Sequence, residues 1–365
     1  MAASPPLLRT TRRLQQTAET SPNNELKRKR AGRPGSWSKR RRTSPSPSAS
    51  STSPSASSII SSTSTCTSTD GDCDQLFVRQ SLSAAMREHN RTRLYVQPIA
   101  WTCRHLMVLN VQFNLNPRLD ACQHSLRVEG VPIKHEVLRA ARQLRCESAE
   151  VQQIAMGEIL KHYKLEELER TNRLELCYGG KKAARVLTDG IFKAESGLGR
   201  LACINLGTVR ALRNEYIWQR NPLYLKRRKV QIPNGPVAGL QNKKLQRLKP
   251  AVEAEDPYIL GVLISLAQKQ RQERKKDVAS DDGDVAEKVY AVAFPFIRAR
   301  VAYFYKAVIP PAFLQKLEKP HEAISCGGFT VSYVPVSLAV PEEALNRLIQ
   351  LFCSNELLHC AQALA

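Results

Sequence analysis

A long run of serine and threonine residues near the N-terminus most constrains what this chain can fold into. Between Thr43 and Thr69, 19 of 27 positions are Ser or Thr, none is charged, and three prolines interrupt the run. Such a segment cannot bury enough apolar surface to offset the conformational entropy of folding. We therefore expect residues 1–75 to be a disordered tail, and any folded core to come from the residues that follow.

The basic side chains are unevenly distributed along the 365 residues. Lys and Arg number 55 against 33 Asp and Glu, which gives a formal net charge of +22. Residues 200–249 carry 12 basic side chains and one acid, whereas residues 250–365 carry 12 basic and 14 acidic side chains. The C-terminal third is nearly neutral, as an ordinary folded surface is, so the excess charge comes mostly from the tail and from a central block.

The basic block of the tail holds two runs of four cations separated by a spacer rich in Gly, Pro and Ser. An extended strip of this kind suits the acidic groove of a carrier protein or a phosphate backbone. The block resembles a bipartite nuclear localisation signal, which implies an importin-type carrier for Lys27, Arg28, Lys29, Arg30, Lys39, Arg40, Arg41 and Arg42. The alternatives are a solvated charge run and a mitochondrial presequence, although Pro5 and Pro6 would interrupt the helix of a presequence.

The spacer also resembles the core of an AT-hook. In that motif an extended Gly-Arg-Pro lies in the narrow minor groove of A·T-rich DNA while flanking cations hold phosphates. Gly32, Arg33 and Pro34 match this core, but Ala31 stands where the motif places an arginine. A single degenerate copy is expected to bind DNA weakly, and the favoured alternative is that it serves only as the spacer of the import signal.

Candidate phosphorylation sites follow the second run of cations, at Thr43, Ser44, Ser46 and Ser53. A phosphate of about −1.5 to −2 charges beside the cations would weaken their hold on an acidic receptor. Regulated nuclear import is the hypothesis that follows.

The residues after the tail predict an α+β body in two folded parts. We expect a helix-rich region with short strands at 76–222, a basic linker loop at 223–255, and a small α+β module at 256–365. In the first part, apolar spacing predicts extended segments at 93–101 and 106–113, and helices at 75–93, 134–145, 151–160, 165–176 and 208–218.

The C-terminal module is the best-defined part of this prediction. Asp256 suits a helix N-cap and Pro257 the first helical position, so a helix is expected over 258–276. A three-stranded sheet with packed helices is expected to follow, with strands at 289–296, 301–309 and 328–338, a short helix after Pro310-Pro311 and a final helix at 342–364.

The order of these elements from Asp256 to about Pro320 resembles a group of uncharacterised proteins from filamentous fungi, including the strand around Tyr303-Phe304-Tyr305-Lys306-Ala307. A weaker similarity covers Val151 to Cys177. The group carries no established activity, so the resemblance implies a folded module and no site residue.

The central basic block offers candidate nucleic-acid contacts at Lys226, Arg227, Arg228, Lys229, Lys243 and Lys244. Tyr216, Trp218 and Tyr224 are close in the sequence, and cations interleaved with aromatic rings can hold a phosphate backbone and stack bases at about 1–3 kcal/mol per stack. A mobile linker or a second import signal is the favoured alternative.

Two Cys-x-His pairs form a weak candidate metal site at Cys103, His105, Cys122 and His124. Four such ligands can bind Zn²⁺ tetrahedrally. Ligands two residues apart rarely converge on one metal unless the backbone turns sharply, and the segment between the pairs is expected to be a strand. Buried thiols and ordinary histidines are therefore the favoured interpretation.

The sequence shows no recognised catalytic motif, because Gly-x-Ser-x-Gly, His-Glu-x-x-His and the kinase signatures are all absent. We therefore expect neither an enzyme nor a cofactor. No run of about 20 apolar residues predicts a membrane span, and scattered cysteines without a secretory signal are typical of reduced thiols inside the cell.

These features favour a nuclear, non-enzymatic regulatory or interaction protein that influences gene expression through a nuclear protein partner. Any contact with DNA or RNA is expected to be electrostatic and weakly specific. The alternatives are a DNA-binding transcription factor, which would use the AT-hook-like core and the central block, and an enzyme with an unrecognised site.

Replacing all eight cations of the import-like strip by alanine should leave a fluorescently tagged chain in the cytoplasm, because the carrier would lose its ligand. Microscopy of the nuclear fraction measures this, and continued nuclear accumulation would contradict it. Ser44→Glu with Ser46→Glu should lower the nuclear fraction if phosphorylation regulates import, and Ser44→Ala with Ser46→Ala is the matched control.

Overall fold

The computed structural model describes residues 81–89, 95–116, 134–146, 148–168, 172–193, 199–219, 235–277, 285–295, 300–355 and 357. The chain divides into two units, Met1–Thr65 and Cys66–Ala365, and all of the described residues belong to the second. The predicted disordered tail lies outside the described residues.

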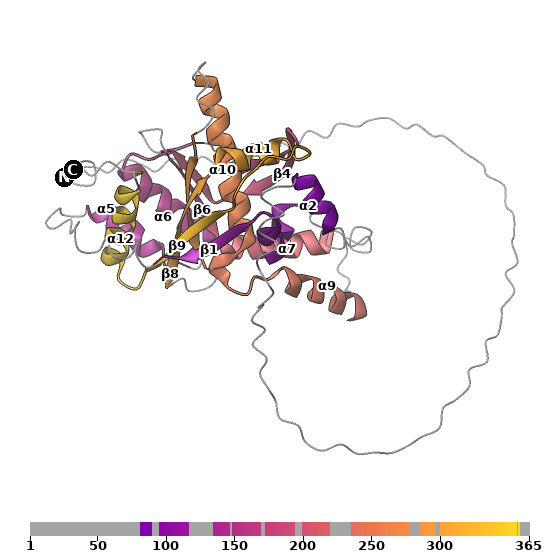
Figure 1. Cartoon of the computed structure of the whole chain (residues 1–365). Helices are drawn as coiled ribbons and strands as arrows, with labels where there is room; N and C mark the ends of the chain where they lie inside the picture. The colour runs from indigo at the N-terminus through magenta and orange to yellow at the C-terminus, as the bar shows by residue number, and fades with distance from the viewer. Residues whose placement is uncertain are drawn as a thin grey trace, which may run out of the picture. The chain divides into compact units, whose positions relative to one another are not determined.

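A mixed sheet of seven strands forms the centre of the second unit (Figure 1). β1 runs parallel to β9 and β6 runs parallel to β7, whereas the other neighbours are antiparallel. In spatial order the strands are β1 (Val111–Leu115), β9 (Phe329–Ser337), β8 (Val301–Ile309), β7 (Glu287–Phe294), β6 (Arg200–Asn205), β5 (Gly190–Lys193) and β2 (Glu166–Glu167).

The strands β6 and β7 are buried on both faces of the sheet. Every residue of β6 is buried, and in β7 only Lys288 is exposed. Successive side chains of a strand point to opposite faces, and the residues of β7 accordingly alternate between two hydrophobic cores, with Val289, Ala291 and Ala293 in one and Tyr290, Val292 and Phe294 in the other. Both faces therefore need a covering layer.

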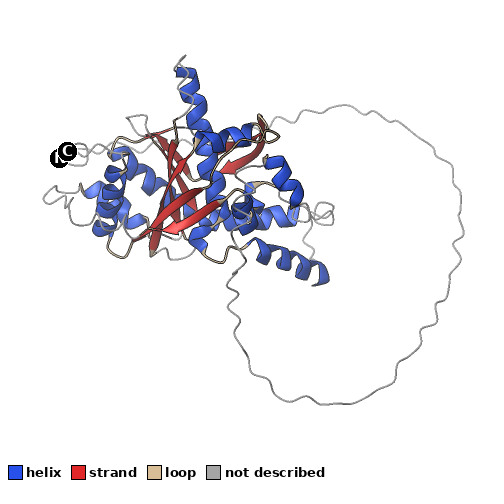
Figure 2. Ribbon diagram, viewed as in Figure 1, coloured by secondary structure: helices blue, strands red, loops and turns tan. Residues whose placement is uncertain are grey.

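Helices cover both faces (Figure 2). One layer contains α5 (His135–Gln143), α6 (Ala149–His162) and α12 (Pro341–Ser354). The other contains a separate hairpin and the remaining elements that share its core: α2 (Leu82–Glu88), η1 (Pro98–Ala100), α3 (Cys103–Val108), β3 (Arg173–Tyr178), β4 (Lys181–Leu187), α7 (Leu206–Gln219), η3 (Glu253–Glu255), α10 (Pro257–Asp277) and α11 (Pro311–Glu318).

The helix α10 is apolar on all sides over its first three turns. Its fully buried residues there include Ile259, Leu260, Val262, Leu263, Ile264, Leu266 and Ala267. A helix with this pattern must be surrounded by protein, and α10 contacts the sheet strands β6 and β7 on one side and the β3–β4 hairpin on the other.

The predicted N-cap of this helix is confirmed. The backbone N–H of Tyr258 donates to the Asp256 carboxylate at 2.9 Å. The same carboxylate accepts two hydrogen bonds, of 2.7 and 2.5 Å, from the guanidinium of Arg213 on α7, and both side chains are buried. This bidentate ion pair joins α7 to the first turn of α10.

The α+β class is confirmed, but the predicted three-stranded sheet is too small. The expected C-terminal strands are present as β7, β8 and β9 and pair antiparallel. Strands from before residue 223 extend them on both sides, β6 beside β7 and β1 beside β9. An apolar three-stranded sheet would leave two edges of unpaired backbone groups, and these added strands pair with them. The two parts expected on either side of 223–255 therefore share one sheet.

Four further predictions are wrong in detail. The segment expected to be extended at 93–101 contains the 3-10 helix η1. The helix expected at 165–176 is replaced by β2 and β3, where Leu174 and Leu176 alternate with exposed residues at the period of a strand. The segment expected to be extended at 106–113 begins as α3 and becomes β1 only at Val111. The linker expected at 223–255 contains the helix α9 (Gly235–Leu248) and the turn η3.

The other predicted helices are present. They correspond to α5, α6, α7, α10, α11 and α12, the last of which ends at Ser354, and α2 occupies part of the helix expected at 75–93. Within the described residues, no helix combines the length and the apolar character needed to cross a bilayer.

Candidate functional site

Most of the site residues predicted from the sequence lie outside the described residues. These are the import-like cations Lys27–Arg30 and Lys39–Arg42, the core Gly32, Arg33 and Pro34, the phosphorylation sites Thr43, Ser44, Ser46 and Ser53, the cations Lys226–Lys229, and the metal candidates Cys122 and His124. Of the remaining four, Lys243 and Lys244 lie exposed on α9.

The other two, Cys103 and His105, lie on different sides of one helix. Both lie on the short helix α3, where residues two apart point about 200° from each other. Cys103 is exposed, against the expectation of a buried thiol, whereas His105 is buried. The described residues contain no group of three or more metal-binding side chains.

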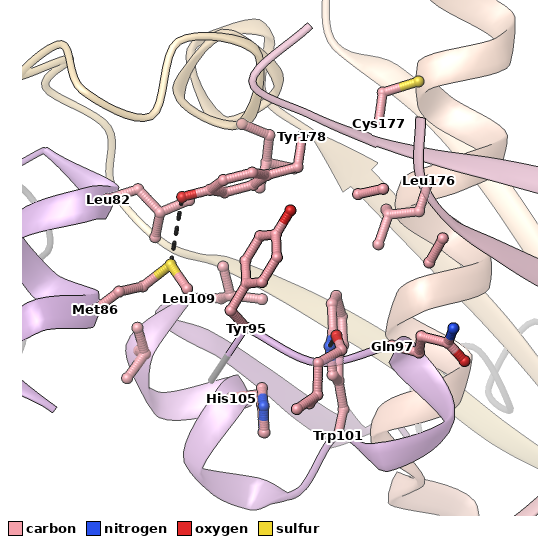
Figure 3. Close-up of a pocket in the computed structure, with 15 residues that line it drawn as sticks. Leu82, Met86, Tyr95, Gln97, Trp101, His105, Leu109, Leu176, Cys177 and Tyr178 are labelled. Carbon is pink, nitrogen blue, oxygen red and sulfur yellow. Dashed lines mark hydrogen bonds between the residues drawn. The ribbon is translucent and has the colours of Figure 1, made fainter. Parts of the chain in front are cut away.

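A pocket of about 190 Å³ lies beside the β3–β4 hairpin, and sequence reasoning did not predict it (Figure 3). Its lining is mainly apolar and contains three aromatic side chains and two sulfur atoms. We call it the aromatic pocket, and its lining residues are Leu82, Met86, Tyr95, Val96, Gln97, Trp101, His105, Val108, Leu109, Leu176, Cys177, Tyr178, Ala183, Ala184 and Leu317.

The hairpin wall of the pocket is held by two side chains of α10. The register of the hairpin shifts between Leu176 and Cys177, because Leu176 pairs with Ala184 and Cys177 pairs with Lys182, which leaves Ala183 of β4 as the extra residue of a bulge. The buried Gln268 amide accepts from Cys177 N–H at 2.8 Å and donates to Cys177 C=O at 2.9 Å. At the other end of the hairpin, the Tyr258 hydroxyl donates to Leu187 C=O at 2.8 Å and accepts from Leu187 N–H at 2.9 Å.

The floor of the pocket is the Trp101 ring, and Gly261 of α10 lets Pro98 of the preceding turn η1 pack closely. A Cβ atom at Gly261 would lie 2.8 Å from Pro98 and 3.8 Å from the Trp101 ring. The Trp101 indole N–H donates to Val96 C=O at 3.1 Å, and Arg213 donates to Ile99 C=O at 3.2 Å. The η1 turn that carries Trp101 is thus fixed by both α10 and α7.

His105, which also lines the pocket, packs against Trp101. Its ring stacks on Trp101 with centroids 5.8 Å apart and an interplanar angle of 13°. The backbone N–H of Thr102 donates to His105 Nδ1 at 2.9 Å, so Nδ1 is an acceptor and the proton of the neutral ring lies on Nε2.

Two tyrosines form the remaining side of the pocket, as Figure 3 shows. Tyr95 and Tyr178 meet edge to face with ring centroids 5.6 Å apart. Burial raises the pKa of Tyr178, although a hydrogen bond with Ser83 lowers it, so the phenol is protonated at neutral pH and donates to Met86 Sδ at 3.3 Å. A thioether sulfur is a weak acceptor, so a better acceptor that enters the pocket would gain this hydrogen bond.

Tyr95 differs from the other aromatic residues because its side chain is 72% exposed. It lies between Tyr178 and Trp101 and presents a ring to solvent beside the apolar lining. No described residue of the lining is Asp, Glu, Lys or Arg. The arrangement offers apolar burial, aromatic faces and a few neutral hydrogen-bonding groups.

The pocket had no local signal in the sequence. Tyr95 and Trp101 lie in a segment predicted only to be extended, and Tyr178 lies two residues after a segment predicted to be a helix. Their side chains meet only because α10 brings the hairpin beside η1 and α3.

No protein-family model and no curated protein matches this chain.

The contribution of the Gln268 amide to stability can be tested with Gln272 as the control. Gln272 is exposed one turn later on α10, and its amide approaches Cys177 only at the Sγ atom, at 3.8 Å. Gln268→Leu should lower the free energy of unfolding by about 1–3 kcal/mol, because Cys177 N–H and C=O lose their buried partners. Gln272→Leu should change it by less than about 0.5 kcal/mol. Urea unfolding of the full chain measures both, and equal effects would contradict the role given to Gln268.

Proposed function

We propose that this chain is a nuclear, non-enzymatic interaction protein whose folded unit binds a protein partner through the aromatic pocket. The observation that carries the proposal is an apolar pocket with an exposed tyrosine beside it. In this proposal the partner inserts one apolar or aromatic side chain between Tyr95, Tyr178 and Trp101.

The size of the pocket favours a single side chain over a small-molecule ligand. Sites for drug-sized ligands and cofactors span about 300–1,000 Å³. The aromatic pocket measures about 190 Å³, and a cavity of about 150 Å³ is enough for a benzene ring. An anchor residue of a protein partner needs a space of this kind at the centre of an interface.

The composition of the pocket also favours a side chain of a protein partner as its occupant. The buried centres of protein interfaces are enriched in Tyr, Trp and Met and depleted in Lys, Glu and Asp. Tyr95, Trp101, Tyr178 and Met86 provide such a lining, and Met107, which is 61% exposed, adds apolar surface on α3. An exposed Tyr95 ring loses little conformational entropy when a partner covers it, because its side chain has only two rotatable angles.

The nuclear part of the proposal is supported by the sequence of the tail. The two runs Lys27–Arg30 and Lys39–Arg42 suit an importin-type carrier, and the tail precedes the first described helix of the folded unit. Import and partner binding would then use separate segments of the chain.

Site-specific photo-crosslinking tests the proposed occupant. p-Benzoylphenylalanine placed at Tyr95 of the full-length chain in nuclei should give a discrete adduct with one protein, whereas the same probe at Val308, which is 43% exposed on β8, should not. Ala184→Leu should reduce the Tyr95 adduct several-fold, because Ala184 lines the pocket and a leucine there fills it. Ala211→Leu, at an exposed position of α7, should leave the adduct unchanged.

An adduct that Ala184→Leu does not reduce would place the contact outside the pocket and contradict the proposal. The same holds if the adducts from Tyr95 and Val308 are identical. If a small molecule occupies the pocket instead, no protein adduct forms at Tyr95, and native mass spectrometry of the purified chain shows the added mass.

A further inference from the structure

The helix α9 presents a cationic face that the aromatic pocket does not explain. Gln241 is buried, and Leu245 lines a cleft shared with Leu206 of α7, so this side of α9 packs against the folded unit. Residues three and four apart share one face of a helix, so Leu240, Lys243, Lys244 and Arg247 lie together on the other side. In Figure 1, α9 lies at the edge of the unit, away from the sheet.

The cations of this face form no ion pair among the described residues, although Lys249, which follows α9, lines a cleft with Glu253 and Asp256. Lys243, Lys244, Arg247 and Lys249 are all exposed. The sequence contains no Asp or Glu between Glu215 and Glu253. Solvated cations concentrated in this way form a positive field that attracts a polyanion.

We propose that this face of α9 binds the phosphate backbone of duplex DNA without reading its sequence. The rise of a helix from Lys243 to Arg247 is about 6 Å, which covers nearly two of the 3.4 Å steps between successive charges of one DNA strand. The cations on one straight helix can therefore meet neighbouring phosphates of a regular duplex. This surface is separate from the aromatic pocket and does not depend on it.

The side chains of the face favour a duplex over single-stranded nucleic acid and over a membrane surface. Proteins that bind single-stranded nucleic acid combine cations with exposed aromatic rings on which bases stack. The exposed residues of α9 from Leu240 onward include Asn242, Lys243, Lys244, Gln246 and Arg247 and no aromatic residue. An amphipathic helix that binds a membrane inserts an apolar face, but the apolar side of α9 is packed against the unit, and only Leu240, at 54%, is an exposed large apolar residue on it.

Salt dependence measures how many phosphates the face contacts. Each phosphate contact with duplex DNA contributes about −0.9 to the slope of log affinity against log salt. Replacing Lys243, Lys244 and Arg247 by glutamine should therefore reduce the slope by about 2.7. Between 50 and 200 mM salt, these three contacts would account for an about 40-fold change in affinity.

The experiment compares the full-length wild-type chain with two charge-matched triple variants, by fluorescence anisotropy on a duplex of mixed sequence. One variant carries Lys243→Gln, Lys244→Gln and Arg247→Gln. The control carries Lys181→Gln, Arg185→Gln and Lys275→Gln, which remove the same charge from exposed positions of β4 and α10. Because both variants keep the basic tail, only a local contribution of α9 separates them.

We expect the slope of log affinity against log salt to become shallower by about 2.7 in the α9 variant and by less than about 0.5 in the control. Equal losses from the two variants, or no binding at 50 mM salt, would overturn the proposal. It would also be overturned if the α9 variant weakened binding to single-stranded RNA, or to vesicles rich in phosphatidylserine, more than binding to the duplex.

Discussion

The β3–β4 hairpin is held by two side chains of α10 that each satisfy both backbone groups of one hairpin residue. Tyr258 and Gln268 are ten residues apart, which corresponds to about 15 Å along a helix. Their targets, Leu187 and Cys177, lie at opposite ends of the hairpin, because Leu187 pairs with Arg173 four residues before Cys177. Four residues of strand span about 13 Å, which is close to the spacing of Tyr258 and Gln268 along α10. The two side chains therefore hold the hairpin at both of its ends, alongside the helix.

This attachment explains why the aromatic pocket exists. The hairpin forms no pairing with the seven-stranded sheet and would otherwise be a two-stranded ribbon, which is marginally stable alone. Gln268 holds the backbone of Cys177, opposite the bulge, and the next residue, Tyr178, lines the pocket. Gly261 and Arg213 fix the opposite wall, which carries Trp101. One buried helix thus positions both walls of the site that we propose for the partner.

The sequence predicted the elements of the C-terminal half well, because their signals are local. Asp256 and Pro257 marked the start of α10, and the strands that became β7, β8 and β9 were recognised from their apolar residues. The partners of α10, which is apolar on every side over its first turns, cannot be read from its own sequence. The parallel pairs β1–β9 and β6–β7 join segments that are separated by about 90 to 220 positions, and no local pattern specifies them.

The aromatic pocket could not be predicted for the same reason. Tyr95 and Trp101 come from one segment and Tyr178 from another. The residues just before Tyr178 were assigned to a helix because Leu165, Leu168, Leu174 and Leu176 fit helical spacing as well as strand spacing. The bulge at Ala183 has no sequence signature that separates it from regular strand. In contrast, the basic residues of α9 were recognised as a group from composition alone, and only their placement on one helical face required the structure.

The central claim is that the aromatic pocket accepts one side chain of a partner, and a titration with side-chain analogues tests it most directly. The full-length chain, labelled at methyl groups, would be titrated with p-cresol and toluene and followed by NMR. Saturable shifts with one site per chain are predicted at Met86, Leu109, Leu176 and Ala184, and Ala184→Leu should abolish the shifts at the first three. No saturable shift at these methyl groups, or shifts that persist in Ala184→Leu, would contradict the account.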